Sequence, residues 1–132
     1  MAFLERIRVL FTGDDTAPLV EYPDQFERVE VPRLEVHTAN LSPDTDEVLV
    51  ILTTTPALLG VLKETPGPVQ AVCEGARPVT FVPVEKRADP LLDPNLGWLI
   101  PVTEATRREI ATTPDGPGAH EFSSLHLGLV LE

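Results

Sequence analysis

Fourteen prolines are spread along this chain of 132 residues, and they limit the length of every regular element. Proline breaks helix interiors, and within sheets it is confined to edges, strand starts and turns. A share about twice the usual level of roughly 5% predicts short strands, many turns and few long helices. We expect a single domain over residues 1–132 that is mainly β, a sandwich or small barrel with two or three short helices. An α+β fold is the alternative.

Two segments carry the clearest strand patterns. Residues 26–41 alternate apolar and polar side chains, but Pro32 interrupts the alternation. This pattern predicts either one edge strand or two strands that meet at a bend. Residues 48–53 form a nearly continuous apolar run, which is typical of a strand covered on both faces.

Two segments have the pattern of short helices. Thr55 followed by Pro56 is a helix start, with a hydroxyl for the N-cap and proline at the first helical position. The leucines that follow give this helix one apolar face. Residues 103–113 predict a second helix of about two turns, with Thr103 as its cap.

The rest of the chain divides into hairpins, strands and loops. Residues 69–84 predict a hairpin, and residues 98–102 and 123–132 predict strands. We expect loops at 85–97, which holds two Asp-Pro pairs, and at 114–122. Residues 2–11 are ambiguous, because their apolar side chains satisfy both periods, and we expect a helix at the start of this segment and a strand at its end.

Charge excludes some classes of partner. The net charge is −11, and a strongly anionic surface repels nucleic acid backbones and anionic lipids. No run approaches the roughly 18 apolar residues that a membrane span needs. The opening residues place charges among apolar side chains and lack a small-residue cleavage site, so we expect no signal peptide and a protein made in the cytoplasm.

No catalytic or metal-binding motif is recognisable. Cys73 is the only cysteine, and its alternation with Val69 and Ala71 favours a small buried side chain over a nucleophile. The histidines show none of the short spacings of structural zinc sites. The acidic stretches at 14–16 and 44–47 lack the full pattern of a calcium loop. We expect no metal and no cofactor.

The sequence therefore favours a non-enzymatic structural or interaction subunit of a larger, homo-oligomeric assembly. A phage-like virion component (capsid decoration, head–tail connector or tail protein) is the narrowest form of this expectation, and it would place the protein in the virion. Contacts are expected in the segment around residues 3–11 and in the loops 85–97 and 114–122. The predicted contact residues are Phe3, Arg6, Arg8, Phe11, Leu91, Leu92, Trp98, His120 and Phe122.

Two other functions stay open at this point. The first is a small-ligand or regulatory module with a pocket near Thr53–Thr55, lined by Leu58, Leu62 and Trp98. The second is a small hydrolase or transferase, in which Cys73 would work with His120 or His126.

Overall fold

The computed structural model describes residues 22–40 and 48–132. This part of the chain is mainly β with two short helices, which confirms the predicted fold class, and its sheets form no closed barrel. The elements are β1 Glu27–Glu30, β2 Glu35–Asn40, β3 Val48–Thr54, α2 Pro56–Glu64, β4 Val69–Val72, β5 Val79–Pro83, β6 Leu91–Asp93, β7 Gly97–Val102, α3 Glu104–Thr112, β8 Gly118–Phe122 and β9 Leu127–Leu131.

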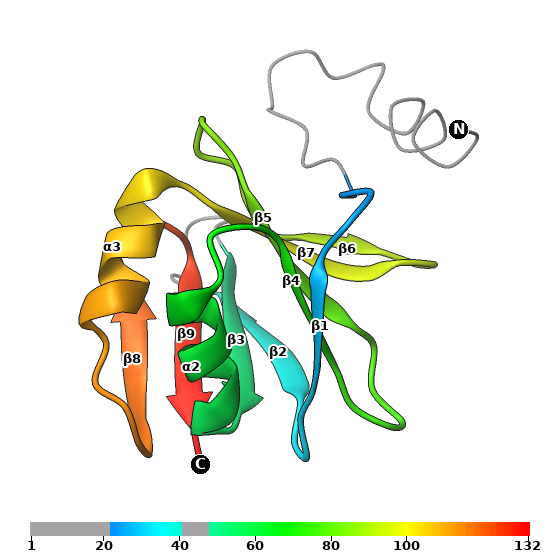
Figure 1. Cartoon of the computed structure of the whole chain (residues 1–132), viewed down its shortest axis with the longest axis horizontal. Helices are drawn as coiled ribbons and strands as arrows, with labels where there is room; N and C mark the ends of the chain where they lie inside the picture. Colours follow the sequence, from blue (N-terminus) through cyan, green and yellow to red (C-terminus); the bar gives the residue numbers. More distant parts are fainter. Residues whose placement is uncertain (1–21, 41–47) are drawn as a thin grey trace.

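The strands form two mixed sheets. The five-stranded sheet has the order β1-β4-β5-β7-β6, and the four-stranded sheet has the order β2-β3-β9-β8. Three neighbouring pairs are parallel, namely β1 with β4, β5 with β7, and β3 with β9. Figure 1 shows the two sheets side by side at an angle, with both helices packed on one side of them.

One hydrophobic core joins both sheets and both helices. Alternate residues of the central strands point into it, such as Leu52 on β3 and Leu129 on β9. Helix α2 contributes its leucine face, and α3 contributes Ile110. Within β3 the burial is one-sided, because Leu49 and Ile51 on the other face are only half-buried. The expectation that this strand is covered on both faces therefore holds only in part.

The bend predicted near Pro32 is present, and it moves the chain from one sheet to the other. Strand β1 ends before Pro32 at an edge of the five-stranded sheet, and β2 begins after it at an edge of the four-stranded sheet. Buried Val31 and Leu34 anchor the crossing segment in the core. The hydroxyl of Thr54 donates a 2.8 Å hydrogen bond to the carbonyl of Arg33.

Three sequence-based boundaries are corrected. The segment 85–97 contains strand β6, which pairs antiparallel with β7. The segment 114–122 contains strand β8, which pairs antiparallel with β9. The strand predicted over residues 123–132 begins only at Leu127, because residues 123–126 form the turn between β8 and β9.

A second, smaller cluster covers the opposite face of the five-stranded sheet. Val82, Leu99 and Ala88 are its buried members. Beside them the amide of Gln70 donates 3.0 Å hydrogen bonds to the hydroxyls of Thr80 and Tyr22. A buried amide needs such partners, and these bonds tie the segment before β1 to the sheet.

The two helices differ at their N-caps. The Thr103 side chain accepts a hydrogen bond from the Thr106 N–H, as predicted for α3. Thr55 stands at the N-cap of α2, but its side chain makes no capping bond. Its hydroxyl oxygen is buried and lacks a hydrogen-bond partner in the described ranges. The predicted capping role of the Thr55 hydroxyl is therefore wrong.

This difference gives an expected result for a pair of valine variants. Thr55→Val should raise the free energy of unfolding by about 1 kcal/mol, because it removes an unsatisfied buried hydroxyl and keeps the side-chain shape. Thr103→Val should lower it by about 1 kcal/mol, because it removes a working cap. Urea unfolding of both variants checks the signs, and a loss of stability in Thr55→Val would show that this hydroxyl has a partner in solution.

Candidate functional site

The hairpin formed by β6 and β7 is the most prominent projection of the described chain, at the right of Figure 1. Its turn is built by Asp93, whose carboxylate accepts hydrogen bonds from the backbone N–H groups of Asn95 (2.7 Å) and Leu96 (2.9 Å). Gly97 closes the turn with a φ of +87°, a conformation that favours glycine. The turn is therefore held by its own backbone and one buried carboxylate.

This hairpin places two predicted contact residues directly opposite each other. Leu92 on β6 and Trp98 on β7 are cross-strand partners. Leu92 is 41% exposed, and among the described residues it is the large apolar side chain that stays exposed. Trp98 is half-buried and packs against the main core. Together they form an apolar surface, called the hairpin surface below, which is rigid on the Trp98 side and open on the Leu92 side.

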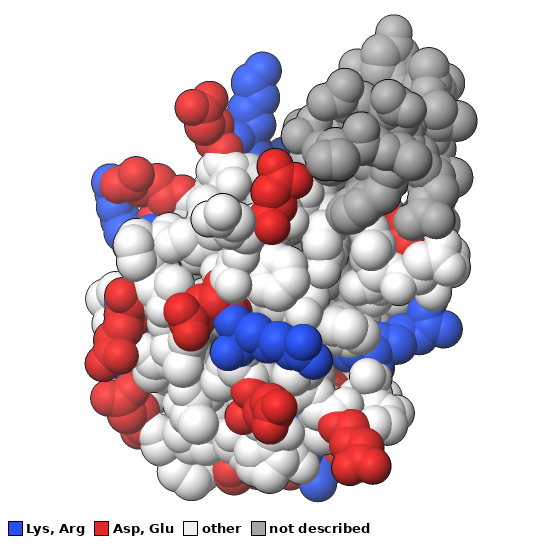
Figure 2. Space-filling model, turned by 45° about the vertical axis from the view of Figure 1, so that its right-hand side comes forward, with Lys and Arg blue, Asp and Glu red and all other residues white. Residues whose placement is uncertain are grey.

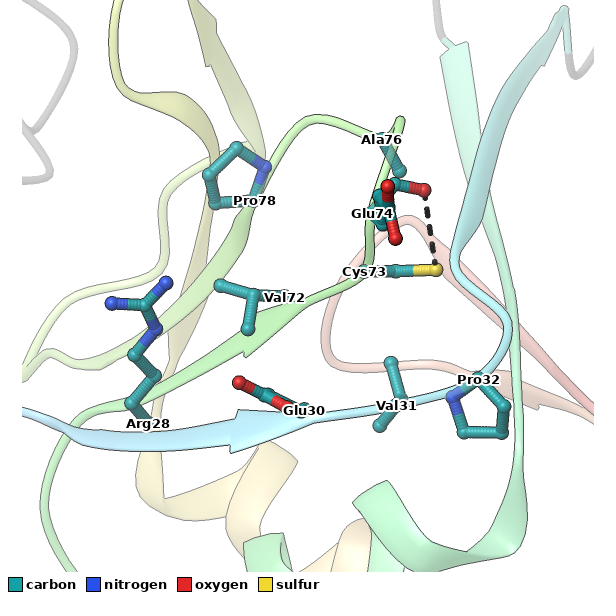
Figure 3. A pocket seen from close by; sticks show the side chains of 9 residues that line it. All are labelled: Arg28, Glu30, Val31, Pro32, Val72, Cys73, Glu74, Ala76 and Pro78. Atoms are coloured by element: carbon teal, nitrogen blue, oxygen red, sulfur yellow. Dashed lines mark hydrogen bonds between the residues drawn. The ribbon is translucent and has the colours of Figure 1, made fainter.

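An open groove lies next to this hairpin, with a volume of about 720 Å³. Figure 3 shows β1 and the crossing segment along one side and the β4–β5 turn along the other. Six of the nine lining side chains are apolar or weakly polar, and the three charged ones come from β1 and the turn. The lining residues are Arg28, Glu30, Val31, Pro32, Val72, Cys73, Glu74, Ala76 and Pro78.

The groove and the hairpin are connected through Pro78. Pro78 lines the groove, and its carbonyl accepts a 2.9 Å hydrogen bond from the Trp98 N–H. A Cβ atom added to Gly97 would lie 2.3 Å from the same carbonyl oxygen. The contact is thus close enough to require glycine, and it fixes the hairpin against the groove.

Cys73 lies in this groove and is half-buried, not fully buried as its alternation predicted. Its thiol faces the backbone carbonyl of Glu74 at 3.8 Å, a weak interaction. Neither His120 nor His126, the bases considered for a cysteine nucleophile, lines the groove.

The other predicted contact residues are dispersed. Phe3, Arg6, Arg8 and Phe11 lie outside the described residues. Leu91 packs on the smaller cluster, on the opposite face of the sheet from Leu92. His120 is half-buried on β8. Phe122 is only 5% exposed and belongs to the main core, so it is not available on the surface of a single subunit.

The residues expected to line a pocket near Thr53–Thr55 belong to the main core. Leu58 and Leu62 are buried there. A cavity that Leu62 does line, together with Arg107 and Ile110, has a volume of only about 10 Å³. This is at the lower limit for one water molecule, so the cavity does not suit a ligand. The larger groove lies at the β4–β5 turn, where no sequence motif indicated it.

Among the described residues, Glu109 on α3 has a shifted pKa, and its carboxylate holds a turn in place. The Glu109 carboxylate on α3 accepts hydrogen bonds from the backbone N–H groups of Ser123 and Ser124, each at 2.9 Å, and from both serine hydroxyls. Burial acts to raise the pKa of Glu109, but the bonds from Ser124 and Ser123 outweigh it and hold the pKa below its usual value. This carboxylate clamp fastens the β8–β9 turn to α3.

Over the described ranges, no group of three His, Cys, Asp or Glu side chains is arranged to hold a metal ion. The same ranges contain no helix that has both the length and the apolar character to cross a bilayer. Searches against protein-family models, curated proteins and solved structures found no match.

Proposed function

We propose that this protein is a non-enzymatic interaction subunit that associates with copies of itself through the β6–β7 hairpin. The observation that carries the proposal is the cross-strand pair of exposed Leu92 and half-buried Trp98. Tryptophan is enriched at protein interfaces, and the exposed leucine beside it adds apolar area that a partner can bury. Leu92 is 41% exposed in the single subunit, so burial of the exposed part contributes about 1 kcal/mol.

The distribution of charge is compatible with such a contact. The chain carries a net charge of −11, so self-association requires a surface that does not bring many acids together. Figure 2 shows, on the side where the hairpin comes forward, acidic and basic side chains interspersed with wide uncharged areas. Within the hairpin, the Asp93 carboxylate is buried and hydrogen-bonded. An apolar contact here avoids the repulsion that the total charge implies.

The proposal includes the narrower expectation of a phage-like virion component, made in the cytoplasm and assembled into a particle. Its support is the combination of a small, acidic, mainly β subunit with a projecting apolar hairpin. A ring, tube or shell of the purified protein in electron micrographs is the result expected for this class.

The test is the solution mass of the chain across a concentration series, measured by light scattering. The unmodified protein should exceed its 14.4 kDa monomer mass as concentration rises. Leu92→Asp should weaken the association at least about 100-fold, because it removes the burial of two leucines and places two unpaired carboxylates in an apolar contact.

Ala105→Asp is the matched control, because Ala105 is exposed on α3, away from the hairpin. It adds the same charge and should leave the association unchanged. A monomer at all concentrations, or equal association of Leu92→Asp and the control, would contradict the proposal.

A further inference from the structure

We infer that the groove beside the β4–β5 turn is the receptor for the β6–β7 hairpin of a second copy of this chain. This inference rests on the proposed self-association and names the surface that Leu92 enters. The groove offers Val72 and Ala76 as half-buried apolar lining. The groove is open and has a volume of about 720 Å³, so a projecting side chain can enter it from solvent.

Charge favours a hairpin of this same chain as the occupant. The groove carries Arg28 and two acids, Glu30 and Glu74. The hairpin tip between Leu92 and Gly97 has a single charged residue, Asp93, whose carboxylate is already bonded inside the turn. The tip also presents the exposed Asn95 amide, which is a hydrogen-bond donor suited to the carboxylates of the groove.

The geometry also favours a reciprocal arrangement. The hairpin and the groove adjoin at Pro78, whose carbonyl accepts the Trp98 N–H. When a protruding element and its receptor lie side by side on one subunit, a two-fold axis between two copies can seat each hairpin in the groove of the other. Such a contact is closed, and it buries two Leu92 side chains and two grooves at once.

The native cysteine provides a direct test. Cys73 lines the groove and is the only cysteine of the chain. In Leu92→Cys, mild oxidation with diamide should link the introduced thiol of one copy to Cys73 of the other. Asn95→Cys is the second variant, because it places a thiol on the same tip and keeps Leu92. Docking raises the local thiol concentration from about 10 μM in solution to the millimolar range, so the linked dimer should form on the order of 100-fold faster than by random collision.

Ala111→Cys gives the rate of random collision, because Ala111 is exposed on α3. Adding Cys73→Ser to either hairpin variant should abolish the link between the groove peptide and the hairpin peptide in mass spectra. Links only between two hairpin thiols, in a protein that still associates, would overturn the groove assignment and leave the self-association in place. A link within one subunit would also overturn it. Monomers that cross-link no faster than Ala111→Cys would overturn both proposals.

Discussion

Replacing Gly97 by alanine is expected to lower the free energy of unfolding by at least about 3 kcal/mol. The new methyl group would lie 2.3 Å from the Pro78 carbonyl oxygen, which is backbone and cannot rotate away. Relief of this overlap requires the β7 start to move and weakens the bond between the Trp98 N–H and Pro78. The positive φ of +87° adds about 1–2 kcal/mol of its own for any residue with a Cβ. Urea unfolding followed by Trp98 fluorescence measures the loss.

Gly75→Ala separates the cost of the positive φ from the cost of the overlap with the Pro78 carbonyl. Gly75 has nearly the same φ, +83°, but a Cβ there would meet no atom within 4 Å. In this control the free energy of unfolding should fall only by the cost of the positive φ, about 1–2 kcal/mol. Equal losses in the two variants would show that the close approach of Pro78 does not constrain Gly97. Because the same contact fixes the hairpin, Gly97→Ala should also weaken self-association under native conditions.

Replacing Glu109 by glutamine should lower the free energy of unfolding by about 2–3 kcal/mol at neutral pH. The carboxylate accepts hydrogen bonds from two backbone N–H groups and two hydroxyls, and bonds to a charged acceptor are the stronger kind. A glutamine keeps one acceptor oxygen, but its NH₂ group faces donors of the β8–β9 turn. Urea unfolding of the wild type and the variant gives the difference.

The pH dependence of this difference has a defined sign. The folded-state pKa of Glu109 is depressed, so its contribution is complete above the unfolded glutamate pKa of about 4.3. The contribution is lost as the pH falls through the lower folded pKa, because the protonated carboxyl is a poorer acceptor. The difference in the free energy of unfolding between the wild type and Glu109→Gln should therefore become smaller from pH 6 to pH 3.

Glu104→Gln is the control on the same helix. Glu104 pairs with Arg108 at 3.4 Å, and both side chains are largely exposed. Exposed pairs of this kind contribute little, so the variant should lose less than about 1 kcal/mol. The clamp would be refuted if Glu104→Gln lowered the free energy of unfolding as much as Glu109→Gln does. It would also be refuted if the difference between the wild type and Glu109→Gln did not change with pH.

The fold class and the strong elements were predictable because local patterns decide them. Proline spacing indicated short elements, and the alternation around Val69 gave the β4–β5 hairpin. Thr103 marked the start of α3, since its capping bond is local. Thr55 has the same local pattern, but its buried hydroxyl makes no capping bond. This outcome depends on tertiary packing that a local motif does not contain.

The missed strands, β6 and β8, have weak local signals. β6 is three residues long and lies between two Asp-Pro pairs, while β8 begins with glycine and contains a charged residue. Each becomes a strand because a stronger neighbour, β7 or β9, supplies the pairing edge.

The candidate site was predictable only in part, for the same reason. Leu92 and Trp98 were expected as contact residues, but their opposition across a hairpin follows from the pairing of β6. The groove joins Arg28 on β1 with Pro78 before β5, residues that no spacing rule connects.

The position of β9 bears on how the chain acquires its shape during synthesis. All five strands of one sheet lie between Glu27 and Val102, so they leave the ribosome before β9 does. β3 pairs with β9 in parallel, and until Leu127–Leu131 emerge it has only the β2 neighbour. A nascent chain at that stage has all five strands of one sheet, but its shared core is incomplete and β3 has one open edge, the kind of edge that promotes aggregation. The core that both sheets share is therefore complete only when the turn after β8 has brought β9 to the centre of its sheet.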